Sequence, residues 1–84
     1  MLIYSIKDVK SGFTSIFPRA NDELANRDFY GAVNGETNQL NLFPEDFELW
    51  RIAEFNPDSG EIKSDLKFIT NAISVKDFKH GNEV

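Results

Sequence analysis

The chain has no cysteine, and this absence excludes several kinds of chemistry at once. Without thiols there are no disulfides, no thiolate zinc sites and no cysteine nucleophile. A secreted domain of only 84 residues would usually need such cross-links, so we expect the protein to work in a reducing cytoplasm. Met1 leads directly into a strand-like segment with no basic region and no long apolar run. We therefore expect neither a signal peptide nor a membrane span.

Basic residues are also scarce in this chain. Nine lysines and arginines stand against fourteen acidic residues, which gives a formal net charge of −5. This balance argues against non-specific phosphate binding as the dominant activity, because that activity needs a basic surface. A local basic patch can still form on an acidic protein, so a nucleic-acid partner remains an alternative.

The chain offers little from which to build an active site. The single histidine, His80, lies in residues 79–84, which we expect to form a flexible polar tail. A catalytic base needs a fixed position and a partner, and such a tail provides neither. Glu45, Asp46 and Glu48 lack the ligand spacing of a calcium or magnesium site and fit a solvated turn better. We therefore expect no enzyme activity, no cofactor and no metal.

Aromatic residues, in contrast, are plentiful: eight Phe, two Tyr and one Trp. They supply large buried areas to one small domain, which we expect to comprise residues 1–84. Residues 2–7 and 13–17 have strand-like composition, and the turn-rich segment 8–12 separates them. This arrangement predicts a β-hairpin at the start of the chain.

Residues 21–35 predict the one clear helix. Asn21 is a suitable N-cap, and Gly35 suits a left-handed position just beyond the helix. Helical spacing gathers one apolar stripe from Leu24, Ala25, Phe29, Ala32 and Val33. We expect this stripe to pack on the sheet.

The second half of the chain predicts two further strands. The polar residues 36–43 indicate a loop or a short irregular segment, and Pro44 begins a turn before a strand over 47–55. The sequence "NPDSG" predicts a tight turn with Gly60 in a left-handed position, followed by a return strand from "EIKSD". Residues 66–78 fit either a short helix or a final strand.

This order of elements predicts an α+β fold. We expect a small, mainly antiparallel sheet in the order β-β-α-β-β, followed by a short C-terminal element. The helix is expected to pack on one face of that sheet.

Binding is the remaining class of function. Alternation along the strand over 47–55 places Trp50 and Arg51 on opposite faces. An exposed tryptophan near basic residues can bind single-stranded nucleic acid, because bases stack on aromatic rings while cations contact phosphates. The candidate residues are Arg19, Trp50, Arg51, Lys63 and Lys67. The alternative, which we favour, is that Trp50 packs under the helix or at a dimer interface, because large aromatic residues in small domains are usually buried.

The shape of the surface around Trp50 would separate two kinds of partner. A contiguous positive groove lined by Trp50, Tyr4 or Tyr30 favours DNA. A flat apolar patch favours a protein.

Four segments carry a family resemblance in their order and spacing. They are "IYSIKDVKSG", "FYGAVN", "PEDFELWRIAEF" and "DSGEI". They resemble the small non-structural protein of gokushovirus-type microviruses, which are tailless phages with circular single-stranded DNA genomes. The matching positions are Asp8 and Lys10, Val33 and Asn34, Pro44 to Phe47 with Leu49, Glu54 with Phe55, and Ser59 with Gly60, within about residues 2–75. Two positions depart from the family pattern: Ala53 replaces a frequent glycine, and Arg51 replaces a common aromatic residue.

The resemblance implies a role rather than a reaction. It implies an accessory protein of viral single-stranded DNA synthesis and replication, acting in the host bacterial cytoplasm. Its partners would be single-stranded DNA, viral or host replication proteins, or both. Independently of the resemblance, the small size of the chain favours a homodimer, because a dimer adds buried area that one 84-residue core lacks. The alternative is an acidic protein-interaction module, such as a scaffold or a host-factor binder, with no direct DNA contact.

Overall fold

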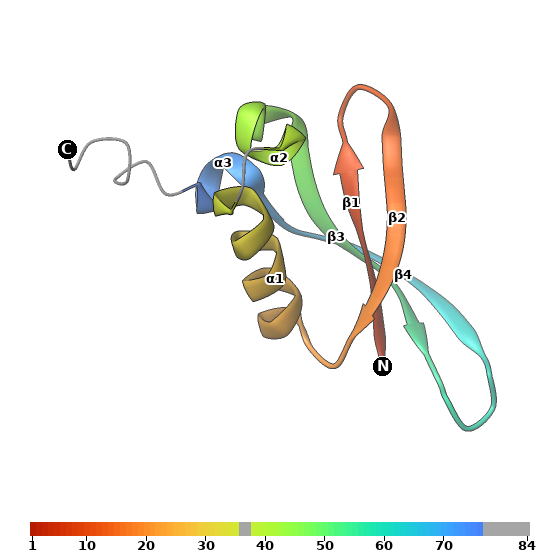
Figure 1. Ribbon diagram of the computed structural model, residues 1–84. Helices are drawn as coiled ribbons and strands as arrows, with labels where there is room; N and C mark the ends of the chain where they lie inside the picture. Colours follow the sequence, from red (N-terminus) through yellow and green to blue (C-terminus); the bar gives the residue numbers. More distant parts are fainter. Residues whose placement is uncertain (36–37, 77–84) are drawn as a thin grey trace.

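A computed structural model describes residues 1–35 and 38–76 of the chain. It contains one four-stranded antiparallel sheet in the order β2-β1-β3-β4, with helix α1 packed against it (Figure 1). The strands are β1 (Leu2–Asp8), β2 (Gly12–Arg19), β3 (Phe47–Phe55) and β4 (Ile62–Asn71). The helices are α1 (Asp22–Asn34), α2 (Gln39–Leu42), α3 (Ala72–Val75) and the single 3₁₀ turn η1 (Pro44–Asp46). The predicted α+β fold is confirmed, while the expected tail at 79–84 lies outside the described residues.

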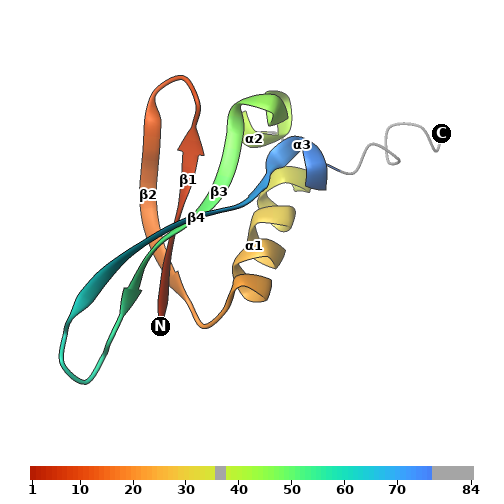
Figure 2. The ribbon, with the colours of Figure 1, turned by 180° about the vertical axis from the view of Figure 1, so that it is seen from behind.

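The N-terminal strand occupies the interior of the sheet. β1 pairs with β2 through the predicted hairpin and with β3 on its other side. The three α-helices gather together at one side of the sheet, and the β3–β4 hairpin extends away from them (Figures 1 and 2). No helix in the described part of the chain is long and apolar enough to cross a membrane.

The core forms where the apolar stripe of α1 meets the sheet. Ala25, Phe29 and Val33 are buried, as their spacing predicts, and they cluster with Tyr4 and Leu49 of the sheet. Phe47 and Ala72 complete the buried cluster. Ala32 is exposed, so its assignment to the core stripe was wrong. It falls at the border of the face that the three buried residues define, and that border does not reach the sheet.

The helix ends differ from expectation at one point only. Asn21 caps α1 as predicted, since its side chain accepts a hydrogen bond from the backbone N–H of Leu24. Gly35 has φ −84°, so its predicted left-handed conformation was wrong. A Cβ atom at Gly35 would lie 2.8 Å from the carbonyl oxygen of Gly31, so glycine is required there for close backbone approach. Gly60 does adopt the predicted left-handed conformation, with φ +79°.

Two segments between the main elements are more ordered than a loop. The predicted loop at 36–43 was wrong for residues 39–42, which form α2 with Asn38 as its N-cap. The sequence of residues 66–78 fits either a strand or a helix, and residues 77 and 78 lie outside the described part of the chain. The chain does both in turn: β4 continues to Asn71, and Asn71 then caps the short α3.

Pairing becomes irregular at the middle of β3. The β3–β4 register shifts between Leu49 and Trp50 and again between Arg51 and Ala53, and each shift gives β4 one extra residue. Such bulges bend and twist a strand. Beyond them, residues 54–64 form a protruding hairpin, which we call the arm, and it contributes to a longest dimension of 52 Å.

Candidate nucleic-acid interface

The face of the sheet opposite α1 carries an aromatic surface. Leu49 is fully buried in the core with α1, so Trp50, its neighbour in β3, points to the opposite face. Residues directly opposite one another in neighbouring strands share a face. Across the four strands this row consists of Ile16, Ser5, Trp50 and Phe68, and the next row begins with Phe13 and Lys7. We call Phe13, Trp50 and Phe68, with Lys7 and Ile16, the aromatic face.

Three rings of the aromatic face contact one another edge to face. The centroid of Trp50 lies 5.9 Å from that of Phe13, at 82°, and 5.7 Å from that of Phe68, at 79°. Phe13 and Phe68 are 45% and 44% exposed, although both are large apolar side chains. The indole N–H of Trp50 donates a hydrogen bond of 2.8 Å to the Glu48 carboxylate, which fixes the ring orientation. The result is an ordered aromatic surface that remains accessible.

Lys7 places a cation on this surface. The Lys7 Nζ atom lies 5.5 Å from the centroid of Phe13 and 5.4 Å from that of Trp50. Contacts of this kind contribute about 0.5–1 kcal/mol at exposed sites. They hold the positive charge of Lys7 against the rings of Phe13 and Trp50.

A bulge between β1 and β2 brings Phe13 to this cation. Ser5 pairs with Ile16 while Lys7 pairs with Phe13, so β2 has one extra residue between the two pairs. Hydroxyl groups satisfy the backbone there. Ser5 Oγ lies 3.1 Å from the carbonyl oxygen of Ser15, and Thr14 Oγ1 donates to the carbonyl of Ile6 at 2.7 Å. Polar side chains thus stabilise the irregular pairing that positions Phe13.

Arg51 points to the helix side, away from the aromatic face. Its Nη1 atom lies 3.0 and 2.9 Å from the two carboxylate oxygens of Asp22, at the start of α1. Its Nε atom donates to Asp65 of β4 at 3.0 Å. The hydroxyl of Tyr4, which is fully buried, also donates to Asp22. This polar cluster fastens the N-terminus of α1 to β1, β3 and β4, so the charge of Arg51 is engaged within the protein.

Charge states in this polar cluster follow from its contacts. The hydrogen bond from Tyr4, and then the hydrogen bond and charge of Arg51, lower the pKa of the Asp22 carboxyl despite its partial burial. Burial and the bond to Asp22 raise the pKa of the Tyr4 hydroxyl far above its ordinary value. Burial opposes a charged Arg51, but Asp22 outweighs it and the pKa of Arg51 is raised. The cluster is therefore an anionic Asp22 held between a neutral phenol and a guanidinium.

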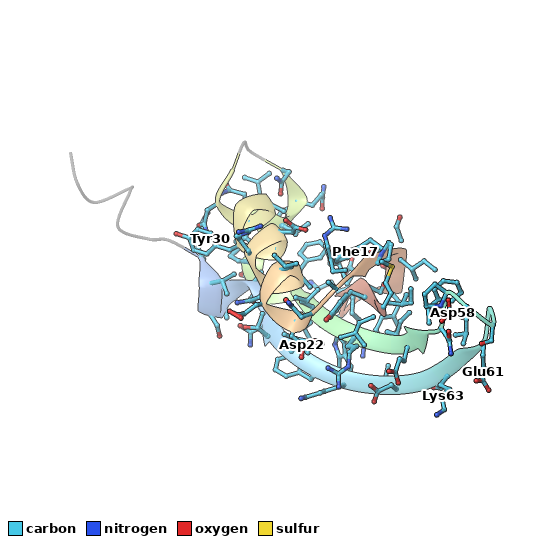
Figure 3. All side chains as sticks on the ribbon, turned by 90° about the horizontal axis from the view of Figure 1, so that it is seen from below. Phe17, Asp22, Tyr30, Asp58, Glu61 and Lys63 are labelled. Carbon is cyan, nitrogen blue, oxygen red and sulfur yellow. The ribbon has the colours of Figure 1, made fainter. Side chains whose placement is uncertain are left out.

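The other predicted cations also lie away from Trp50. Arg19 pairs with Asp28 of α1, and its guanidinium carbon lies 5.2 Å from the ring centroid of Phe17. Lys67 pairs with Arg51 across β3 and β4, and its charge contributes to the lowered pKa of Asp22, so it lies on the helix side. Lys63 lies on the arm, with Glu61 and Asp58 nearby, far from α1 (Figure 3). Of the five predicted site residues, only Trp50 belongs to the aromatic face.

Sequence reasoning missed Lys7, Phe13 and Phe68, which surround Trp50. Alternation within each strand was predictable from the sequence. The pairing of β1 with β3 was not, because it joins residues about 40 to 50 positions apart. The prediction that Trp50 could lie under the helix was wrong, because Leu49 takes that position. Of the tyrosines considered beside it, Tyr4 is buried in the core and Tyr30 lies on α1 (Figure 3).

The acidic residues after Pro44 serve local structure. Asp46 lies 3.7 Å from the ammonium of Lys10, and Glu48 holds the indole of Trp50. Within residues 1–35 and 38–76, no group of three or more acidic or histidine side chains is arranged to hold a metal ion.

The fold and the aromatic face define a small α+β sheet protein with an accessible aromatic surface. The family to which it belongs is evident from comparison of its sequence with protein-family models. The model described as "Phage ORF5 protein" matches residues 1–75, so the chain belongs to the phage ORF5 family and is a bacteriophage protein. No curated protein and no solved structure matches the chain significantly.

Proposed function

We propose that this protein is a non-structural accessory protein of viral single-stranded DNA synthesis and replication, which binds single-stranded DNA through its aromatic face. The single observation that carries the proposal is the row of accessible rings, Phe13, Trp50 and Phe68, with Lys7 placed between two of them. Membership of a phage family supports the viral setting. The microvirus resemblance supports the replication role and a site of action in the host cytoplasm.

The physical basis of this binding is stacking rather than charge. Each base stacked on an aromatic side chain contributes about 1–3 kcal/mol, whatever its identity. Lys7 can neutralise a phosphate beside the stacked bases, whereas the net charge of −5 offers little long-range attraction. We therefore expect weak sequence preference and a shallow dependence of affinity on salt.

Replacing Trp50 with alanine is expected to weaken binding to a fluorescein-labelled oligothymidine by about tenfold to a hundredfold, which corresponds to the loss of one stacked base. Fluorescence anisotropy at low salt measures this directly. Phe43→Ala is the control, because Phe43 is an aromatic residue outside the aromatic face and is as exposed, at 48%, as Phe13 and Phe68 within it. Wild-type protein that shows no binding at low salt, or equal losses in both variants, contradicts the proposal.

Lys7→Gln tests the contribution of the cation separately. The slope of log K against log salt concentration is expected to decrease in magnitude by about 0.7, the value for one phosphate contact on a single strand. Lys10→Gln serves as the control, because Lys10 lies in the β1–β2 turn and contacts Asp46 instead of the rings. If Lys7→Gln and Lys10→Gln change the slope equally, the cation on the aromatic face has no special role.

A protein partner is the second candidate for the same surface. Ile16 extends the aromatic face with an exposed aliphatic side chain, Glu48 lies at its border, and the described cations outside Lys7 do not form a groove there. An acidic protein with an apolar patch is suited to a partner with a basic rim, such as a replication or host factor. In that case Trp50→Ala abolishes capture of a purified replication protein, while the wild-type chain binds no oligonucleotide.

A further inference from the structure

The outer edge of β4 is an unpaired strand edge. β4 is the last strand in the order β2-β1-β3-β4, and its residues 62–68 are all exposed. Ile62 and Leu66 are 65% and 61% exposed, which is unusual for large aliphatic side chains. An edge of this kind presents free N–H and C=O groups to another strand.

The sequence of this edge is complementary to itself when read in opposite directions. Around Ser64 the order is "EIKSDLK", from Glu61 to Lys67. Two copies placed antiparallel about Ser64 bring Lys63 opposite Asp65 of the second copy, and Glu61 opposite its Lys67. Ile62 then meets Leu66 of the second copy. Because the pairing is symmetric, each of these contacts forms twice.

We propose that the outer edge of β4 is a homodimer interface, in which β4 of two copies pair antiparallel about Ser64. Opposite charges across neighbouring strands stabilise a pair, and like charges destabilise it. On two regular strands, all charged residues from 61 to 67 would meet a residue of opposite sign in this register. The occupant that best fits the edge is therefore a second copy of this chain.

The bulge in β4 limits this complementarity to the contact between Lys63 and Asp65, on which the register depends. The extra residue of β4 lies between Ser64 and Lys67, opposite Ile52. Contacts beyond the bulge, Glu61 with Lys67 and Ile62 with Leu66, are offset by one position, which turns their side chains to opposite faces of the sheet. Lys63 remains beside Asp65 of the second copy, because this contact lies next to the axis.

The opposite edge of the sheet is less suited to the same role. β2 contains Pro18, which has no N–H group to donate to a new strand. Its segment from Phe13 to Phe17 carries no charged residue that could set a register. Edge pairing at β4 is thus favoured over edge pairing at β2.

The consequence is a continuous eight-stranded sheet. Antiparallel edge pairing relates the two copies by a twofold axis perpendicular to the sheet, so both aromatic faces lie on the same side. The interface itself does not depend on what the aromatic face binds. It is measured without DNA, so failure of the dimer and failure of DNA binding are distinguishable.

Exchanging the charges at Lys63 and Asp65 tests the proposed register of the two β4 strands. Sedimentation equilibrium of the wild-type chain should show a monomer–dimer equilibrium. Lys63→Glu and Asp65→Lys should each raise the dimer dissociation constant about tenfold or more, because each sets like charges across the edge twice. Mixing the two variants restores opposite charges at both positions and should give a heterodimer. The double variant K63E/D65K should again form a homodimer.

Two controls and three contrary outcomes complete the test. Lys10→Glu and Asp58→Lys make the same charge changes in turns outside the edge, and both should dimerise as the wild type does. Asp65→Lys also removes a bond to Arg51, whereas Lys63→Glu leaves that cluster intact, so circular dichroism of both verifies folding. A wild-type chain that stays monomeric at millimolar concentration overturns the proposal. So do single variants that dimerise normally, or a mixture that does not associate.

Discussion

Replacing Phe29 with alanine is expected to lower the free energy of unfolding by about 3–5 kcal/mol. Phe29 is only 1% exposed and lies at the middle of the α1 stripe that meets Tyr4 and Leu49 of the sheet. Removing the ring leaves a cavity that two neighbouring elements cannot close, because β1 and β3 are held by strand pairing on both sides. A domain of 84 residues has a total stability of about 4–13 kcal/mol, so the loss takes away a large part of it.

Urea unfolding followed by the fluorescence of Trp50 measures this loss. Phe43→Ala is the matched control, because Phe43 is half exposed at the end of α2, and its removal should change stability by less than about 0.5 kcal/mol. If the two variants lose equal stability, α1 does not dock on the sheet through Phe29.

The docking of α1 was predictable because it depends on local pattern. The spacing of Ala25, Phe29 and Val33 defines one helix face whatever the rest of the chain does. Asn21 and Gly60 were equally predictable, since capping and left-handed turns depend on a few adjacent residues. Gly35 was not, because its conformation follows from close contact with the backbone of Gly31.

Only part of the candidate site could be predicted from the sequence, for a related reason. Alternation in β3 separates Trp50 from Arg51 on any regular strand, and the structure keeps this separation. Which face receives the helix depends on the path of the chain after β2. Once α1 covers the Leu49 side, Asp22 is brought to Arg51 and the cation is engaged there.

The identity of the residues that contact Trp50 depends on strand order and on bulges. Lys7 reaches the indole because β1 lies between β2 and β3, and Phe13 reaches it through the extra residue in β2. Phe68 is opposite Trp50 only because the register of β4 shifts just before it. Propensity and spacing do not encode these offsets, so the aromatic face could not be assembled from the sequence.

Replacing Asp22 with asparagine is expected to lower stability by about 1–3 kcal/mol at pH 7, because Arg51 and Tyr4 lose a charged hydrogen-bond partner. The effect should depend on pH in a defined direction. The folded state lowers the pKa of Asp22 below its unfolded value of about 3.9, so its contribution is complete above that pH. The contribution is lost as the pH falls through the lower, folded pKa. The stability difference between wild type and variant should therefore shrink on acidification.

Stability at alkaline pH gives an independent check on the same polar cluster. The folded state raises the pKa of Tyr4, so its contribution is complete below the unfolded value of about 10 and is lost as the pH rises beyond it. Wild-type stability should thus fall above pH about 10 by an amount that Tyr4→Phe removes. Urea unfolding across both pH ranges, with Asp58→Asn as an exposed control, measures the two trends. A stability difference for Asp22→Asn that stays constant down to pH about 2 would show that the folded state does not favour the ionised carboxylate, and the polar cluster would then not anchor α1 through charge.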